Sequence, residues 1–240
     1  MAKPSRPWTV TRHDPLERLD DNLWAINGDV PGFSPAARFH RRMSILKLSD
    51  GRLLFCNAVP VDDATLALIR DLGTPAILVV PHHLHAIDAH AFRERLGLSA
   101  YTGEKEIERT RALLPITGSL AALPVDPAFS IEALPSSKFG EAAVVVRTGP
   151  RVSLLVCDLI LNVRHGGGFP GFLFKVLGFT GPAPRVAPIV RLRAFPNKQA
   201  LRTDLMRLAE LPGLTRVVPS HGLIISDDPA GALRRVASLL

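Results

Sequence analysis

The hydrophobic pattern of the chain predicts strands and helices that alternate after a strand-rich start. Three short apolar runs with strand character come first, at residues 23–27, 44–48 and 52–56. A Ser-Asp-Gly turn at 49–51 joins the last two runs into an antiparallel hairpin. Asp62 and Asp63 then begin a helix that runs to Leu72 and ends at Gly73. Residues 76–80 form a buried strand, because they are a short β-branched run between two prolines.

A second set of elements is predicted in the C-terminal half of the chain. These elements are a hairpin over 142–147 and 152–157, a helix over about 198–211, a strand over 216–219 and a closing helix over 229–240. The hairpin turns at Thr148-Gly149-Pro150 and delivers Asp158 at the end of its second strand. The first helix carries Leu201, Leu205 and Leu208 on one face. The pattern as a whole therefore predicts a mixed α/β chain.

Four of the eight histidines follow the buried strand at 76–80, in the stretch Pro81-His82-His83-Leu84-His85-Ala86-Ile87-Asp88-Ala89-His90. If the chain stays extended here, His83 and His85 point to one side and His82 points to the other. Two imidazoles on one side of a strand end can bind the same metal ion. We therefore expect His83 and His85 to be metal ligands, and His82 to be a group behind the ligands or at the surface.

The residues after these histidines allow two interpretations each. The spacing turns helical from Ala89 to Leu96, and Gly97 follows as a C-terminal stop. Asp88 stands at the start of this helix, so it is either the N-cap or part of the metal site. His90 falls in the first helical turn, where it is either exposed to solvent or a further ligand.

Length and composition are those of a globular protein with a sizeable core. At 240 residues and 47% apolar, the chain is expected to form one domain over 1–240. The polar start, Met1 to Asp14, lacks the apolar middle of a secretion signal, and no apolar run reaches the roughly 20 residues that span a bilayer. A cytoplasmic location follows as the expectation. Cys56 and Cys157 lie in apolar runs without CxxC spacing, which favours buried, reduced thiols.

The positive charge of the chain is concentrated in one segment. The net charge is +7, and residues 159–202 contain seven basic residues and no acidic one. The segment also holds Phe169, Phe172, Phe174 and Phe179 and a run of three glycines, and its pattern is neither a clean helix nor a clean strand. We expect an insertion at about 159–197 that is a lid over a pocket, a membrane-surface contact, a dimer arm or a core segment with solvated arginines. No nucleic-acid-binding motif accompanies the charge, so nucleic acid is not an expected partner.

Metal-compatible side chains follow three predicted strands, in the order His83/His85 with Asp88 and His90, then Asp158, then His221. In this order the chain, over about residues 23–240, resembles the metallo-β-lactamase superfamily. Members of that superfamily carry an HxHxDH loop, a later histidine, an aspartate that ends a strand and a terminal histidine. The resemblance implies a four-layer αββα sandwich. Within the superfamily, the pattern of this chain is most similar to a β-lactamase-like branch with a degenerate metal motif.

The chain departs from the superfamily pattern at two places. If His83 and His85 fill the first two positions, the aspartate of the motif falls on Ile87 and its next histidine on Asp88. The segment where the third histidine belongs, residues 134–141, contains none, and Lys138 is the candidate cation in its place. The resemblance therefore implies at most one zinc or other divalent first-row ion, bound by a set drawn from His83, His85, His90, Asp158 and His221.

Two functions from different classes are compatible with this sequence. The first is a metal-dependent hydrolase of an ester, lactone, thioester or phosphoester, with an anionic or lipid-like small molecule as substrate. In that enzyme Asp88 orients the attacking water by analogy with the superfamily, and Lys138, Asn162 and His165 are weaker substrate-binding candidates. The second is a metal-poor sandwich that acts as a binding scaffold; in it Asp158 bonds the following loop and His221 is a satisfied turn histidine.

Overall fold

The computed structural model describes residues 6–34, 36 and 39–240. The first five residues of the polar N-terminal stretch therefore lie outside the described part. The chain divides into two compact units, each of which is described by itself. Unit 1 comprises the described residues up to Gly28 together with Arg42–Ile131, and unit 2 comprises Asp29–Arg41 and Glu132–Leu240.

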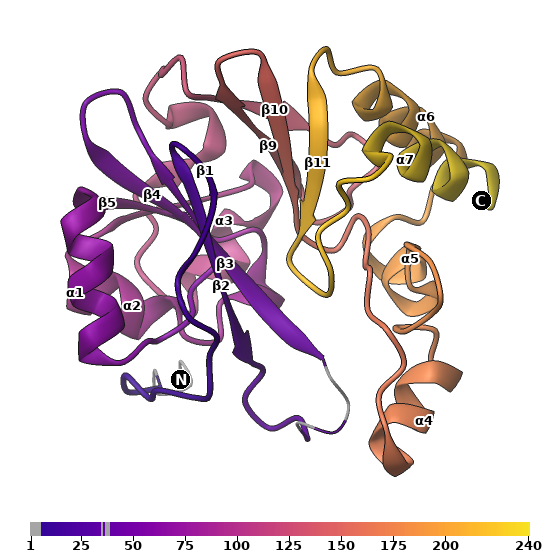
Figure 1. Ribbon diagram of the computed structural model, residues 1–240, viewed down its shortest axis with the longest axis horizontal. Coiled ribbons are helices and arrows are strands. Elements are labelled where there is room, and N and C mark those ends of the chain that lie inside the picture. The colour runs from indigo at the N-terminus through magenta and orange to yellow at the C-terminus, as the bar shows by residue number, and fades with distance from the viewer. Residues whose placement is uncertain (1–5, 35, 37–38) are drawn as a thin grey trace. The chain divides into compact units, whose positions relative to one another are not determined.

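Seven strands form the first sheet, and they follow one another in chain order (Figure 1). They are β1 (Glu17–Asp20), β2 (Leu23–Asp29), β3 (His40–Lys47), β4 (Arg52–Cys56), β5 (Thr74–Val79), β6 (Ser99–Thr102) and β7 (Gly118–Ser119). The β1–β2 and β3–β4 pairs are antiparallel, whereas β4 to β7 are parallel. The predicted hairpin at β3–β4 is confirmed. Its turn contains Gly51 at φ +85°, a left-handed conformation that glycine adopts without strain.

Helices of unit 1 cover the first sheet. They are α1 (Asp63–Leu72), α2 (Ala89–Leu96), α3 (Ile107–Arg111) and the 3₁₀ helices His83–His85, Glu104–Glu106 and Leu120–Ala122. The predicted cap of α1 is confirmed, since the Asp62 side chain accepts a hydrogen bond from the Thr65 amide. Leu66 and Ile69 of α1 and Phe92 of α2 are buried in one apolar core with the strands. This burial drives both helices onto the sheet.

Four strands form the second sheet, in the order β11-β10-β9-β8. They are β8 (Phe129–Ala133), β9 (Ala142–Thr148), β10 (Arg151–Val156) and β11 (Leu214–Pro219). The β9–β10 hairpin is antiparallel, as predicted, and β10 pairs with β11 in parallel. The carboxyl ends of β10 and β11 therefore lie side by side, which places the residues that follow them at the same edge.

Helices of unit 2 divide into two groups. They are α4 (Gly168–Val176), α5 (Pro188–Ala194), α6 (Lys198–Ala209) and α7 (Pro229–Ser238). The last two were predicted, and they share an apolar core with β9, β10 and β11. In contrast, the basic segment, whose pattern is neither a clean helix nor a clean strand, forms α4 and α5. Pro170 and Pro188 obscured both helices in the sequence, yet each lies in a first turn, where a missing N–H is tolerated.

Two sheets with helices confirm the prediction of a mixed α/β fold. Within the residues that the structure describes, we find no helix that is both long and apolar enough to cross a membrane.

Candidate metal centre

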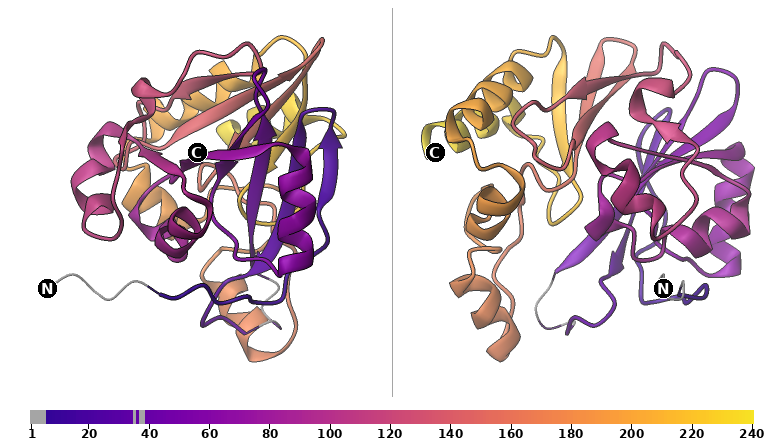
Figure 2. Two further views of the ribbon diagram at one scale, coloured as in Figure 1. Left: turned by 90° about the vertical axis from the view of Figure 1, so that its left-hand side faces the viewer. Right: turned by 180° about the vertical axis from the view of Figure 1, so that it is seen from behind.

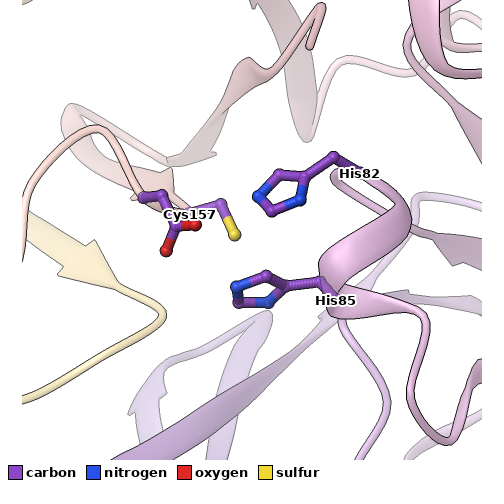
Figure 3. A group of neighbouring side chains, drawn as sticks. His82, His85 and Cys157 are labelled. Atoms are coloured by element: carbon purple, nitrogen blue, oxygen red, sulfur yellow. The ribbon is translucent and has the colours of Figure 1, made fainter. Parts of the chain in front are cut away.

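The histidine loop of unit 1 follows β5 and is helical. Residues His83–His85 form a 3₁₀ helix, so the extended conformation that we predicted for this loop is wrong. A 3₁₀ helix has three residues per turn, which places side chains at i and i+3 on the same side. His82 and His85 are therefore the pair that meets. Their ring centroids lie 4.8 Å apart, and each offers a ring nitrogen within 4.8 Å of the other (Figure 3).

His83 belongs to a different network. Its Nδ1 lies 2.5 Å from Glu106 Oε2, and its backbone amide donates to the same oxygen at 3.1 Å. Arg109 donates to the other oxygen of Glu106 at 3.0 Å. Burial would raise the pKa of Glu106, but these hydrogen bonds outweigh it, so the pKa lies below its ordinary value. Glu106 thus remains ionised and fixes the loop through His83.

Asn57 orients the His85 ring. The Asn57 side-chain amide donates to the Arg42 carbonyl at 3.0 Å, which identifies Oδ1 as the atom that faces His85. His85 Nδ1 lies 3.1 Å from this oxygen and must donate to it, because an amide oxygen only accepts. The lone pair of the neutral ring is then on Nε2. A ring held in this tautomer is suited to metal binding through Nε2.

Asp88 and His90 lie after the loop, on α2. Asp88 is buried and occupies the N-cap position, but its side chain makes no capping hydrogen bond to the described residues at the start of the helix. Its carboxylate lies 3.9 Å from Arg6. His90 Nδ1 lies 3.5 Å from Glu94, one helical turn further on. Within unit 1, the two histidines that come together are thus His82 and His85, while His83 and His90 face carboxylates.

Unit 2 offers donors directly after β10. Cys157 and Asp158 follow the last strand residue, Val156, and Cys157 Sγ lies within 4.8 Å of an Asp158 carboxylate oxygen. Figure 3 shows the Cys157 side chain where the chain leaves the strand. Among the described residues neither cysteine of the chain forms a disulfide. Both cysteines are buried, as predicted.

Glu141 fixes the turn that carries these two donors. It is buried, and its Oε1 accepts the backbone amides of Cys157 at 3.0 Å and Leu159 at 3.2 Å. One carboxylate oxygen therefore bridges the amides on either side of Asp158. A buried carboxylate is stable in this position because charge-assisted hydrogen bonds compensate its desolvation.

His221 follows β11 and completes the donor set of unit 2. Its Nδ1 donates to the His40 carbonyl at 2.7 Å, which leaves the lone pair of the neutral ring on Nε2. Nε2 lies 3.6 Å from Asp158 Oδ1. The ring stacks on Phe39, with centroids 4.4 Å apart. His221 and Asp158 thus lie close together at the edge where β10 and β11 end.

The three weaker candidates all lie in unit 2. Asn162 is buried, and its amide donates to the Leu223 carbonyl at 3.0 Å, beside the His221 turn. His165 lies 2.8 Å from the Thr180 hydroxyl within the basic segment. Lys138 has an exposed side chain, and its backbone amide donates to the Ala194 carbonyl.

Comparison with solved structures identifies the fold. The DIM-1 metallo-β-lactamase, in crystals exposed to ceftazidime, superposes with a TM-score of 0.63 and 15% identity, over 96% of this chain and 99% of that one. The chain has the metallo-β-lactamase fold. A metallo-β-lactamase from Pontibacter korlensis gives a TM-score of 0.62 with 11% identity, over 95% of this chain and 100% of the other.

At such low sequence identity, the comparison with these structures shows the fold alone. No protein-family description matches the sequence, and no curated protein matches it. The donors of the two units, which include imidazole nitrogen, thiol and carboxylate, are nevertheless of the kinds that zinc and other first-row ions bind. The ring tautomers of His85 and His221 fit such an ion as well, because both place a lone pair on Nε2.

Sequence reasoning missed four residues of this region. His82 was set aside because the loop was taken to be extended, and Cys157 because apolar neighbours suggested a packing role. Asn57 is the only described non-glycine residue with a positive φ, +68°, and an asparagine directly after a strand was a signal for a left-handed position. Glu141, an acidic residue directly before an apolar strand, was the only carboxylate in the segment that lacks the third histidine.

Proposed function

We propose that this protein is a metal-dependent hydrolase that binds one divalent ion. The observation that carries the proposal is that His85 and His221 each donate a hydrogen bond through Nδ1, which leaves Nε2 for an ion. In each case a fixed acceptor holds the Nδ1 proton, so that Nε2 is the basic nitrogen. Metal-binding histidines in proteins have this arrangement as a rule. The metallo-β-lactamase fold, shared with two structures whose names describe metalloenzymes, supports the same conclusion.

Each unit offers candidate ligands for such an ion, His82 and His85 in unit 1 and Asp158 and His221 in unit 2. The order of these donors along the chain is the order in the superfamily, with His82 in place of His83. Cys157 is a further donor beside Asp158. A set of histidine, carboxylate and thiolate favours zinc, although iron and manganese bind similar sets.

A bound ion of this kind supplies hydroxide at neutral pH and polarises the ester, lactone, thioester or phosphoester oxygen under attack. The residues of the chain would position the reactants. Asp88 is buried next to the histidine loop, so it is our candidate for accepting a proton from the attacking water. In unit 2 the His221 ring lies on Phe39, which contacts Phe174 and Phe179. Phe39 is half-buried beside His221, so it is our candidate for contact with an apolar part of a small-molecule substrate.

Metal content measured by elemental mass spectrometry tests the proposal. Protein purified without a chelator, then loaded with zinc, manganese or ferrous ion, is expected to hold about one equivalent. His85→Ala and His221→Ala should each lower the metal affinity by at least about tenfold, since each removes one ligand. His90→Ala is the matched control, because His90 faces Glu94 and should leave metal binding unchanged.

The alternative function, a metal-poor binding scaffold, is favoured by one observation. The segment 134–141 carries no histidine, and its carboxylate, Glu141, binds backbone amides. Folded protein that holds no metal after loading would contradict the hydrolase proposal and support this alternative. Equal metal loss in His90→Ala and His85→Ala would instead show that the ion is bound elsewhere.

A further inference from the structure

Helix α4 presents an apolar face to solvent. Large apolar side chains stand at positions i, i+3, i+4, i+7 and i+8, which share one face of a helix. They are Phe169, Phe172, Leu173, Val176 and Leu177, and all are exposed. Phe169 keeps 75% and Val176 keeps 65% of its surface in contact with solvent. Contiguous exposed apolar side chains of this size mark an interaction surface.

The opposite face fixes the orientation of α4. Phe174 is buried and contacts Phe33, Phe39 and Phe179, with ring centroids 5.1 to 5.5 Å apart. Gly171 lies against the Gly166 backbone so closely that a Cβ atom would come within 2.3 Å of it. Packing on this side therefore leaves the apolar residues outside. Within unit 2, α4 lies at the end away from α6 and α7, in all three views (Figures 1 and 2).

The charge of the surrounding segment is uniformly positive. Residues 159–203 contain seven basic residues and no acidic one, so the whole net charge of +7 arises there. Lys175 lies on α4 itself, three residues after Phe172, and its side chain is exposed. Arg164, which precedes α4, and Arg193 on α5 are further exposed basic side chains, whereas Lys198 and Arg202 belong to α6. An apolar helix face with lysine and arginine around it is the composition of helices that lie in the interface of anionic membranes.

We propose that α4 docks unit 2 on a membrane surface with anionic lipid headgroups. The apolar face enters the boundary between headgroups and acyl chains, while Lys175, Arg164 and Arg193 contact phosphates. A nine-residue helix is far shorter than the roughly 20 residues that span a bilayer, so α4 lies on the membrane. A second copy of the chain fits this face poorly, because it would bring two segments of the same charge together. The proposal holds whether or not the protein binds a metal.

Vesicle co-sedimentation tests this docking. The full chain is incubated with phosphatidylcholine vesicles, with and without phosphatidylglycerol, at low and high salt. We expect binding to the anionic vesicles alone, with release at high salt because the headgroup attraction is screened. The double variant Phe172→Ser/Val176→Ser should partition about tenfold more weakly, which corresponds to the burial of roughly one apolar side chain. Leu68→Ser, at an exposed position of α1, is the matched control and should bind like the wild type.

A second variant separates charge from hydrophobicity. Lys175→Glu/Arg193→Glu keeps the apolar face but reverses two exposed charges, so it too should bind anionic vesicles at least about tenfold more weakly. Equal binding to neutral and anionic vesicles, or no binding to either, would overturn the proposal. Light scattering that finds a dimer of the wild type and a monomer of Phe172→Ser/Val176→Ser would overturn it in favour of a second copy. Binding by Phe172→Ser/Val176→Ser at the wild-type level would show that α4 is not the contact.

Discussion

At the scale of single residues, hydrogen bonds on the far side of the histidine rings decide which nitrogen is available for chemistry. His85 donates through Nδ1 to Asn57, and His221 donates through Nδ1 to the His40 carbonyl. The hydrogen bond from the Asn57 amide to the Arg42 carbonyl turns the Asn57 oxygen toward His85. Asn57 is not itself a candidate metal ligand, but it orients His85, which is one.

Substitution of Asn57 tests this positioning role. Asn57→Gly retains the left-handed backbone but removes the acceptor for His85, so metal affinity should fall by about ten- to a hundredfold. Asn57→Asp retains the acceptor, so it should lose less affinity than Asn57→Gly. Competition with a fluorescent chelator measures the affinity, and circular dichroism establishes that both variants are folded. Identical affinities for Asn57→Gly and the wild type would show that His85 is not held by Asn57.

Sequence patterns located the candidate residues better than they selected among them. His85, Asp158 and His221 were chosen as candidates because each follows a predicted apolar strand, and a strand end fixes where the next residues lie. The choice of His83 over His82 rested on an extended loop, whereas the 3₁₀ turn places His82 beside His85. Asn57 and His85 are 28 residues apart, so only the folded chain brings them together.

At the scale of elements, caps and turns were the predictable parts. Both hairpins and the cap of α1 follow from local rules, because Gly51, Gly149 and Asp62 act on residues within three or four positions. Helix α4 was missed because its apolar residues face outward as well as inward. A helix without a polar face lacks the one-sided pattern from which helices are identified.

His221 lies in the turn after β11, and the backbone of this turn requires a glycine at position 222. Gly222 has φ +92°, and a Cβ atom there would lie 2.1 Å from the Asn162 carbonyl oxygen. Gly222→Ala should therefore destabilise unit 2 by more than the roughly 1–2 kcal/mol that a left-handed alanine costs. Gly149→Ala is the control, since Gly149 has φ +56° but open space around it. Chemical denaturation followed by circular dichroism compares the two, and equal destabilisation would contradict a steric role for Gly222.

At the scale of the whole molecule, the basic and the acidic side chains have different roles. The positive excess lies in residues 159–202, whereas Glu106 in unit 1 is a buried carboxylate held by His83 and Arg109. The pKa of Glu106 is lower in the folded chain than in the unfolded chain. A depressed carboxyl pKa stabilises the fold at pH values above the ordinary pKa of glutamate. That contribution disappears as the pH falls through the lowered pKa.

We therefore expect the stability of unit 1 to fall as the pH drops below the ordinary glutamate range, and Glu106→Gln to weaken this dependence. At pH 7 the variant should be less stable by about 1–3 kcal/mol, the usual contribution of hydrogen bonds to a charged group. Urea unfolding followed by tryptophan fluorescence reports on unit 1, because Trp8 and Trp24 both belong to it. Glu108→Gln, an exposed neighbour whose side chain is 86% accessible, is the control. An unfolding midpoint of Glu106→Gln that depends on pH as steeply as that of Glu108→Gln would show that the Glu106 network does not carry the acid sensitivity.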